Sequence, residues 1–101
     1  DIVMRSGRTV DVKTKMVRSM PRPHYDCSVT AGHTGQDCDV YAFVRVLEDM
    51  TCGWYCGAIA KAAFFEQARL VRAGEQDGDN GWIATVDCYN LPISDLGQQP
   101  V

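Results

Sequence analysis

Apolar and polar residues alternate near the start of the chain, a pattern typical of a β-strand with one buried face. Over residues 10–16 the apolar set is Val10, Val12, Thr14 and Met16, and the polar set is Asp11, Lys13 and Lys15. Three further segments rich in β-branched and aromatic residues are predicted strands: Tyr25–Thr30, Val40–Leu47 and Trp82–Tyr89. We expect the apolar set of the first strand to face the core.

The segment from Gly53 to Ala73 has a different pattern, rich in residues that favour helices. At 100° per residue, Cys52, Cys56, Ile59, Ala63 and Leu70 lie on one face, and Lys61, Arg69 and Arg72 lie on the opposite face. Gly74 follows as a C-terminal cap. The sequence therefore predicts one long amphipathic helix with a positively charged outer face.

The element order is three strands, a long helix and a further strand, which indicates an α+β fold with mainly antiparallel β-structure. A small five-stranded barrel of the OB-fold type, with one long helix between the third and fourth strands, fits this order. No linker divides the 101 residues, so we expect a single domain over residues 1–101. Residues 91–101 contain two prolines, a glycine and two glutamines, and are predicted to form a loosely held C-terminal tail.

Charge and hydropathy exclude several classes of function. The formal net charge is -3, which argues against a surface that binds nucleic acid. The longest uncharged stretch, Thr51 to Ala60, is far shorter than a membrane-spanning helix, and the mean hydropathy is -0.20. The composition is that of an ordinary globular domain.

Five cysteines are many for a small protein in a reducing compartment. The chain begins at Asp1 without an initiator methionine or an apolar leader, so we interpret it as a mature secreted protein. Cytosolic location with buried thiols is the alternative. Because five is an odd number, one thiol is expected to be free or to bond another chain.

The favoured disulfide joins Cys27 and Cys38, because the turn-like residues between them allow a hairpin with the two sulfurs facing each other. Either Cys52 or Cys56 is expected to reach Cys88, and that choice stays open. No metal site or cofactor is predicted, because the C-x3-C spacing is not that of a zinc knuckle and the two histidines have no matched spacing.

A catalytic cysteine is an alternative hypothesis. The segment Thr51–Trp54 places Cys52 at the start of the predicted helix, where the helix N-terminus lowers a thiol pKa. Such chemistry needs a histidine base, and only His24 and His33 are present, both before the cysteine. A structural Cys52 is therefore favoured, and we expect the chain not to be an enzyme.

Several short motifs in order resemble the receptor-binding B subunits of pertussis-type AB5 toxins, the group that includes subtilase cytotoxin and typhoid toxin. These motifs are VKTKMVRSMPRPHYDCSVT, QDCDVYAF, a Trp-led segment that ends in FFEQARLVRAGEQ, and WIATV. The matching residues are Pro23, Tyr25, Cys27, Cys38, Trp54, Gln67, Ala68 and Gly74. The resemblance covers residues 10–86. Cys52, Cys56 and Cys88 have no counterpart in it.

This resemblance implies an OB-fold that assembles into a homo-oligomeric ring of five, binds sialylated or related glycans, and carries a catalytic A subunit. In the family, a hydroxyl side chain near the start of the first strand contacts sialic acid, and Thr9 is at the comparable place here, with Ser6 nearby. Separately, glycan sites need aromatic platforms with hydroxyl and amide groups. The candidates are Tyr25, Tyr41, Trp82, Tyr89 and Asn90.

The predicted function is therefore that of a secreted, non-catalytic, glycan-binding subunit of a toxin-like virulence complex, which acts multivalently. Its glycan-binding residues are predicted to be Thr9, Ser6 and Tyr25. The first alternative is a small secreted effector or inhibitor that acts as a monomer by protein–protein contact. The second alternative is a cysteine hydrolase that uses Cys52.

Overall fold

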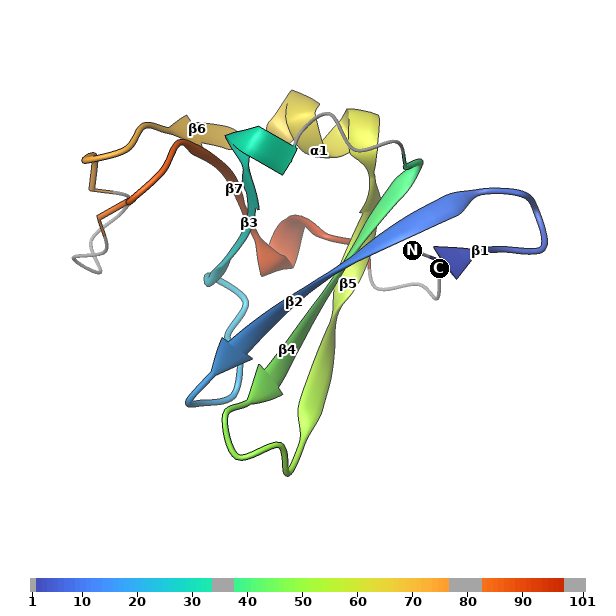
Figure 1. Ribbon diagram of the computed structural model, residues 1–101, viewed down its shortest axis with the longest axis horizontal. Coiled ribbons are helices and arrows are strands. Elements are labelled where there is room, and N and C mark those ends of the chain that lie inside the picture. Colours follow the sequence, from blue (N-terminus) through green and yellow to red (C-terminus); the bar gives the residue numbers. More distant parts are fainter. Residues whose placement is uncertain (1, 34–37, 77–82, 98–101) are drawn as a thin grey trace.

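The protein consists of two β-sheets, one short α-helix and two short 3-10 helices, in a computed structural model that describes residues 2–33, 38–76 and 83–97 (Figure 1). Sheet A has the strand order β1-β2-β4-β5, and sheet B has the order β3-β7-β6. The expected α+β class with predominant β-structure is therefore confirmed. None of the helices in these ranges is long and apolar enough to span a membrane.

Sheet A contains the three longest strands of the described residues. β1 (Ile2–Val3) pairs with the start of β2 (Thr9–Val17), β2 runs parallel to β4 (Val40–Leu47), and β4 runs antiparallel to β5 (Gly53–Ala60). The predicted strands at residues 10–16 and 40–47 are both confirmed. The first half of β4 is buried on both faces, as expected of a continuous run of apolar residues, and the rest is partly buried on its outer face.

Sheet B is shorter and wholly antiparallel. β7 (Cys88–Pro92) lies between β3 (Asp26–Thr30) and β6 (Arg69–Val71). The helix α1 (Lys61–Gln67) connects β5 of sheet A to β6 of sheet B (Figure 1). The 3-10 helices are Ala31–His33, after β3, and Ile93–Asp95, after β7.

The predicted five-stranded closed barrel is not formed. β2 and β3 belong to different sheets and do not pair, so sheets A and B are separated along a seam between these two strands. Over the described residues, β3 is an edge of sheet B, and β2 beyond Val10 has a neighbour only on its β4 side. The connection from β2 to β3 through Pro21 and Pro23 leaves the direction of sheet A instead of forming a hairpin.

The long helix predicted over Gly53–Ala73 is also wrong. Residues 53–60 form β5, the helix is limited to Lys61–Gln67, and residues 69–71 form β6. β4 is a central strand whose backbone groups need partners on both sides, and β5 supplies those on one side. Gly57, at a φ of 137°, adopts a conformation that interrupts a helix. The positively charged helix face predicted from the sequence therefore does not form. Arg69 instead pairs with Asp26, and Arg72 pairs with Asp87.

The C-terminal segment is packed up to Gly97 rather than loosely held. β7 starts at Cys88, six residues later than the predicted strand at Trp82–Tyr89, and extends to Pro92. Leu91, Ile93 and Leu96 are buried, and Gly97 pairs with Ala58 of β5. This segment therefore connects the two sheets. Trp82 and residues 98–101 lie outside the described residues.

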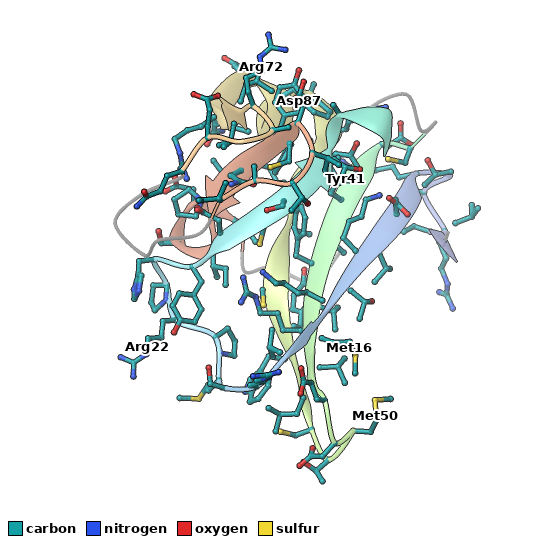
Figure 2. All side chains as sticks on the ribbon, turned by 60° about the vertical axis from the view of Figure 1, so that its left-hand side comes forward. Met16, Arg22, Tyr41, Met50, Arg72 and Asp87 are labelled. Carbon is teal, nitrogen blue, oxygen red and sulfur yellow. The ribbon has the colours of Figure 1, made fainter. Side chains whose placement is uncertain are left out.

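The main core is an aromatic cluster between the two sheets. Tyr41 and Phe43 of β4 meet Phe64 of α1 with ring centroids 5.5 and 5.8 Å from Phe64. The remaining buried members of this cluster come from β3, β5, the segment before β4, and the C-terminal segment: Cys27, Cys38, Cys56, Leu91, Ile93 and Leu96. Figure 2 shows Tyr41 between β3 and β4. The helix contributes mainly one buried side chain, Phe64, to this core.

The alternation in β2 is oriented opposite to the prediction. In register, Asp11, Lys13 and Lys15 lie opposite Tyr41, Phe43 and Arg45, so the polar set faces the space between the sheets. The apolar set faces outward: Val12 is 38% exposed and Met16 is 51% exposed. Figure 2 shows Met16 on the side of sheet A away from β3 and β7. Val10 is buried, but in a separate small cluster with Val40 and Ala42.

Candidate functional site

The seam between β2 and β3 contains a cleft with polar walls. Two adjoining hollows of about 290 and 280 Å³ share Lys15, Asp26, Ser28 and Arg45 as lining residues. The first hollow is also lined by His24, Tyr25 and Asn90, and the second by Lys13, Thr14, Cys27, Phe43 and Val44. The cleft exists because the sheets do not close into a barrel at this point.

Two cationic side chains lie next to each other in this cleft. Lys15 of β2 and Arg45 of β4 are direct partners in the parallel register, so both side chains are on the inner face of sheet A. Burial and the nearby Arg45 guanidinium lower the pKa of Lys15 below its ordinary value of 10.5. No hydrogen bond or ion pair joins Lys15 to another residue of the described ranges. Like charges at adjacent cross-strand positions are destabilising, so this arrangement favours the binding of an anion.

Arg45 is held in place by two contacts with the start of β3. Its Nη2 donates a hydrogen bond of 2.7 Å to the carbonyl oxygen of Asp26, and its guanidinium carbon lies 5.5 Å from the centroid of the Tyr25 ring. The residue is only 7% exposed. Arg45 therefore joins sheets A and B and, in the same position, fixes a positive charge at the wall of the cleft.

The carboxylate in the cleft is already paired. Asp26 Oδ2 lies 2.9 Å from Arg69 Nη2, on the side of sheet B. Because this pair is satisfied, Asp26 offers Lys15 only a longer-range attraction. On the same wall, the Ser28 hydroxyl donates a hydrogen bond to the side-chain carbonyl oxygen of the buried Asn90. The cleft thus combines unbalanced positive charge with hydroxyl and amide groups.

Of the three predicted glycan-binding residues, only Tyr25 lines this cleft. Thr9 is at the start of β2, six residues before Lys15, which is about 20 Å along a strand. Its hydroxyl takes part in hydrogen bonds with Asp39, accepting from the backbone N–H at 3.1 Å and donating to the carboxylate at 3.3 Å. Ser6 is in the turn before β2 and accepts a weak hydrogen bond from the Arg8 backbone. A role for Thr9 and Ser6 in glycan binding stays a prediction.

The hydrophobic pattern of the sequence did not identify Lys15 and Arg45 as residues of the site. Lys15 belongs to the polar set that was expected to face solvent, and Arg45 is a single charge within an otherwise apolar strand. That isolated charge could have indicated the site, because an arginine within a buried strand needs hydrogen-bonding partners or a ligand. Asn90, one of the predicted amide candidates, does lie in the cleft, whereas Tyr41 is buried in the core.

All five cysteines lie in the described ranges, and none of them forms a disulfide in the structure, including the favoured pair Cys27 and Cys38. Cys52 is exposed in the turn between β4 and β5, so the helix N-terminus expected to activate it is not there. The side chain of His33 lies outside the described part of the structure, and His24 lines the cleft. Among the residues that the structure describes, no group of three or more potential metal ligands is found.

Comparisons with known proteins do not identify a family for this chain. No family model, no curated protein and no solved structure matches it.

Proposed function

We propose that this chain is a secreted, non-catalytic protein that binds acidic, sialylated or related glycans at cell surfaces, and that the cleft between β2 and β3 holds the acidic group. The observation that carries this proposal is the adjacent pair of cations, Lys15 and Arg45; in the described ranges Lys15 forms no ion pair, and Asp26 attracts it only at longer range. A carboxylate between them relieves the repulsion and accepts charge-assisted hydrogen bonds.

The other walls of the cleft suit the neutral part of a sugar. Tyr25 provides a half-buried aromatic ring, and His24 packs edge-on against it with ring centroids 4.8 Å apart. Ser28 and Asn90, which are joined by their own hydrogen bond, add a hydroxyl and an amide to the lining of the same hollow. Aromatic faces next to polar groups complement the mixed apolar and hydroxyl surface of a pyranose ring.

We further propose that several copies act together on one surface, as the toxin-subunit interpretation implies. The support comes from the outer face of sheet A, where Val12, Met16 and Tyr55 are 38%, 51% and 44% exposed, because association between copies would bury this apolar area. The long, positively charged helix predicted from the sequence gives this assembly no support, since residues 53–60 form a strand. Five-fold stoichiometry and a catalytic partner subunit stay predictions.

The decisive experiment compares glycan binding of the wild-type chain with that of Lys15→Gln. We expect the wild type to bind sialylated glycans on an array and their asialo forms at least about tenfold more weakly, because one charge-assisted hydrogen bond contributes on that scale. Lys15→Gln is expected to lose the preference for the acidic forms. Arg18→Gln is the matched control, since it removes one positive charge from an exposed pair with Glu48 outside the cleft.

The alternative function, an effector that acts as a monomer by protein contact, is favoured by the same exposed apolar face. The two functions differ in the mass of the native particle and in sugar binding. A monomeric mass together with no binding to any acidic glycan would overturn the proposed function and leave the effector. Equal binding of sialylated and asialo glycans would reject the role of the cation pair.

A further inference from the structure

Cys27 is a buried residue of β3 whose side chain points into the core between the two sheets. In β3 the buried positions alternate, with Cys27 and Val29 buried and Ser28 exposed. Cys27 lies opposite Leu91 of β7 and directly follows Asp26, whose carbonyl oxygen binds Arg45. Its thiol is therefore on the side of sheet B that faces sheet A.

Cys56 reaches the same core through an irregularity in β5. The register of β4 and β5 shifts between the pairs Phe43–Gly57 and Val44–Tyr55, so Cys56 is an extra residue without an opposite partner. Such a bulge changes the direction of a side chain relative to the regular alternation. Cys56 is 5% exposed and belongs to the same core cluster as Cys27, whereas the preceding Tyr55 is 44% exposed.

Arg45 connects the surroundings of these two cysteines. Its guanidinium donates a hydrogen bond to the carbonyl oxygen of Asp26, the residue before Cys27. Cys27 lines the same hollow as Phe43, Val44 and Arg45, and the bulge that contains Cys56 lies beside Phe43 and Val44 of β4. Both cysteines belong to the same buried core cluster, and in agreement with this placement Cys56 contributes, after burial, to the raised pKa of Cys27. The two thiols are thus neighbours across the interface between sheets A and B.

The other three cysteines have different surroundings. Cys38 belongs to the same core cluster, but it lies before the start of β4, near Lys61 and Asp11. From that end of β4, at Val40, to Arg45 the strand extends about 16 Å. Cys88 belongs to a separate small cluster with Val71 and Ala84. Cys52 is exposed in the turn that precedes β5. Of the two other thiols in the core cluster of Cys27, the structure therefore places Cys56 of β5, rather than Cys38, beside the same part of β4 as Cys27.

We propose that Cys27 and Cys56 form an intramolecular disulfide that links β3 to β5 and holds the two sheets together behind the cleft. Formation joins the two sulfurs and releases two protons and two electrons. A low-molecular-weight disulfide such as oxidised glutathione accepts them through a mixed disulfide and is reduced to two thiols. This inference does not depend on glycan binding.

The bond is expected to form during folding. In the folded chain, burial raises the pKa of the Cys27 thiol to about 12 and also raises that of Cys56. Since the thiolate is the reactive species, oxidation of the folded reduced protein is slow at neutral pH, whereas the unfolded chain exposes both thiols. Refolding in a glutathione redox buffer is therefore the appropriate preparation.

The test maps the cross-link in the refolded full-length chain after its remaining thiols are blocked. The enzymes are chosen so that each cysteine has its own peptide: cleavage before Asp37 separates Cys27 from Cys38, and cleavage after Trp54 or Tyr55 separates Cys52 from Cys56. We expect a cross-linked pair of peptides that contain Cys27 and Cys56, about 2 Da lighter than the two reduced peptides together.

A second measurement uses thermal unfolding with and without reductant. The disulfide between Cys27 and Cys56 is expected to raise the midpoint of thermal unfolding of the wild type by more than about 10 °C. The difference between the midpoints with and without reductant is expected to disappear in Cys27→Ala and Cys56→Ala. Cys88→Ala is the matched control, because it removes another buried thiol and should keep the difference. Cys38→Ala should keep it as well.

Three results would overturn the proposal. They are a cross-link from Cys27 to Cys38, full alkylation of Cys27 and Cys56 after oxidative refolding, and a redox-dependent midpoint that survives Cys56→Ala. The peptide map of the wild type decides the matter if a variant does not fold.

Discussion

β2 and β4 are neighbouring parallel strands of sheet A, yet their relation to the core is opposite. β4 is a run of apolar residues with one arginine; both of its faces are buried over Val40–Phe43, and its outer face is partly buried at Val44 and Val46. β2 alternates between apolar and polar residues, and its polar face lies on the inner side of the sheet. Alternation therefore identifies a strand reliably, but an edge strand that borders a cleft need not direct its apolar side chains inward.

Along the inner face of β2, the positive charge is compensated near one end and not near the other. Near Tyr41, Lys13 is paired with Asp11 at 2.8 Å and lies 5.8 Å from the Tyr41 ring centroid, so its charge is compensated. Two residues further along, Lys15 has the guanidinium of Arg45 as its neighbour instead. The compensated end belongs to the folded core, and the uncompensated end is the candidate ligand site. Four substitutions test the contrast between β4, which belongs to the core, and β2, which borders the cleft.

The largest effect is expected from Phe43→Ala in β4. Phe43 is almost fully buried between Tyr41 and Phe64, so the substitution leaves a large cavity and should lower the free energy of unfolding by about 3–5 kcal/mol. The comparison is Val12→Ala on the outer face of β2, which should change it by less than about 1 kcal/mol. Urea denaturation measures both. Similar losses for the two variants would mean that the outer face of β2 is buried in solution.

Arg45→Ala is expected to have the second-largest effect. The substitution removes a charge-assisted hydrogen bond between the sheets and leaves the Asp26 carbonyl oxygen without this donor, which should lower the stability by about 2 kcal/mol. Arg18→Ala removes a cation from an exposed pair and should change it by less than about 0.5 kcal/mol. A loss of similar size at both positions would contradict the view that Arg45 links the two sheets.

Tyr41→Phe is expected to make the protein more stable. The hydroxyl of Tyr41 is buried without a hydrogen-bond partner in the described part of the chain, so removing it should raise the stability by about 1 kcal/mol. Burial likewise raises the pKa of Tyr41 to about 12, which a spectrophotometric titration of the tyrosines can detect. A measured destabilisation would indicate that the hydroxyl has a partner in solution.

The smallest effect is expected for Lys15→Gln without ligand. The lowered pKa means that folding disfavours the charged Lys15, so the substitution should slightly increase stability at pH 7, by less than about 1 kcal/mol because solvent screens the side chain. This gain is fully present below the lowered folded pKa and disappears as the pH rises from that value to 10.5. Unfolding curves at neutral pH and above pH 10 measure the difference. The opposite sign at neutral pH would remove the argument for an anion site.

Sequence reasoning succeeded where local composition and tertiary structure agree. Val40–Leu47 is β-branched and aromatic on both faces, and the structure contains a strand with the same bounds. The prediction was wrong over Gly53–Ala60, where alanines and a helical period favoured a helix, but the partners that β4 requires and the backbone at Gly57 impose a strand. Of the candidate site, Tyr25 and Asn90 were found, and the cation pair was not.

The sequence by itself determined the class of the protein, the positions of three strands and the buried nature of β4, because these depend on properties of residues close together in the chain. Only the tertiary structure decided which face of β2 is inward, where the barrel stays open and which cysteines are neighbours. Those features depend on the pairing of residues far apart in sequence: Lys15 with Arg45, Arg45 with Asp26, and Cys27 with Cys56. Periodicity within a single segment contains no information about such pairs.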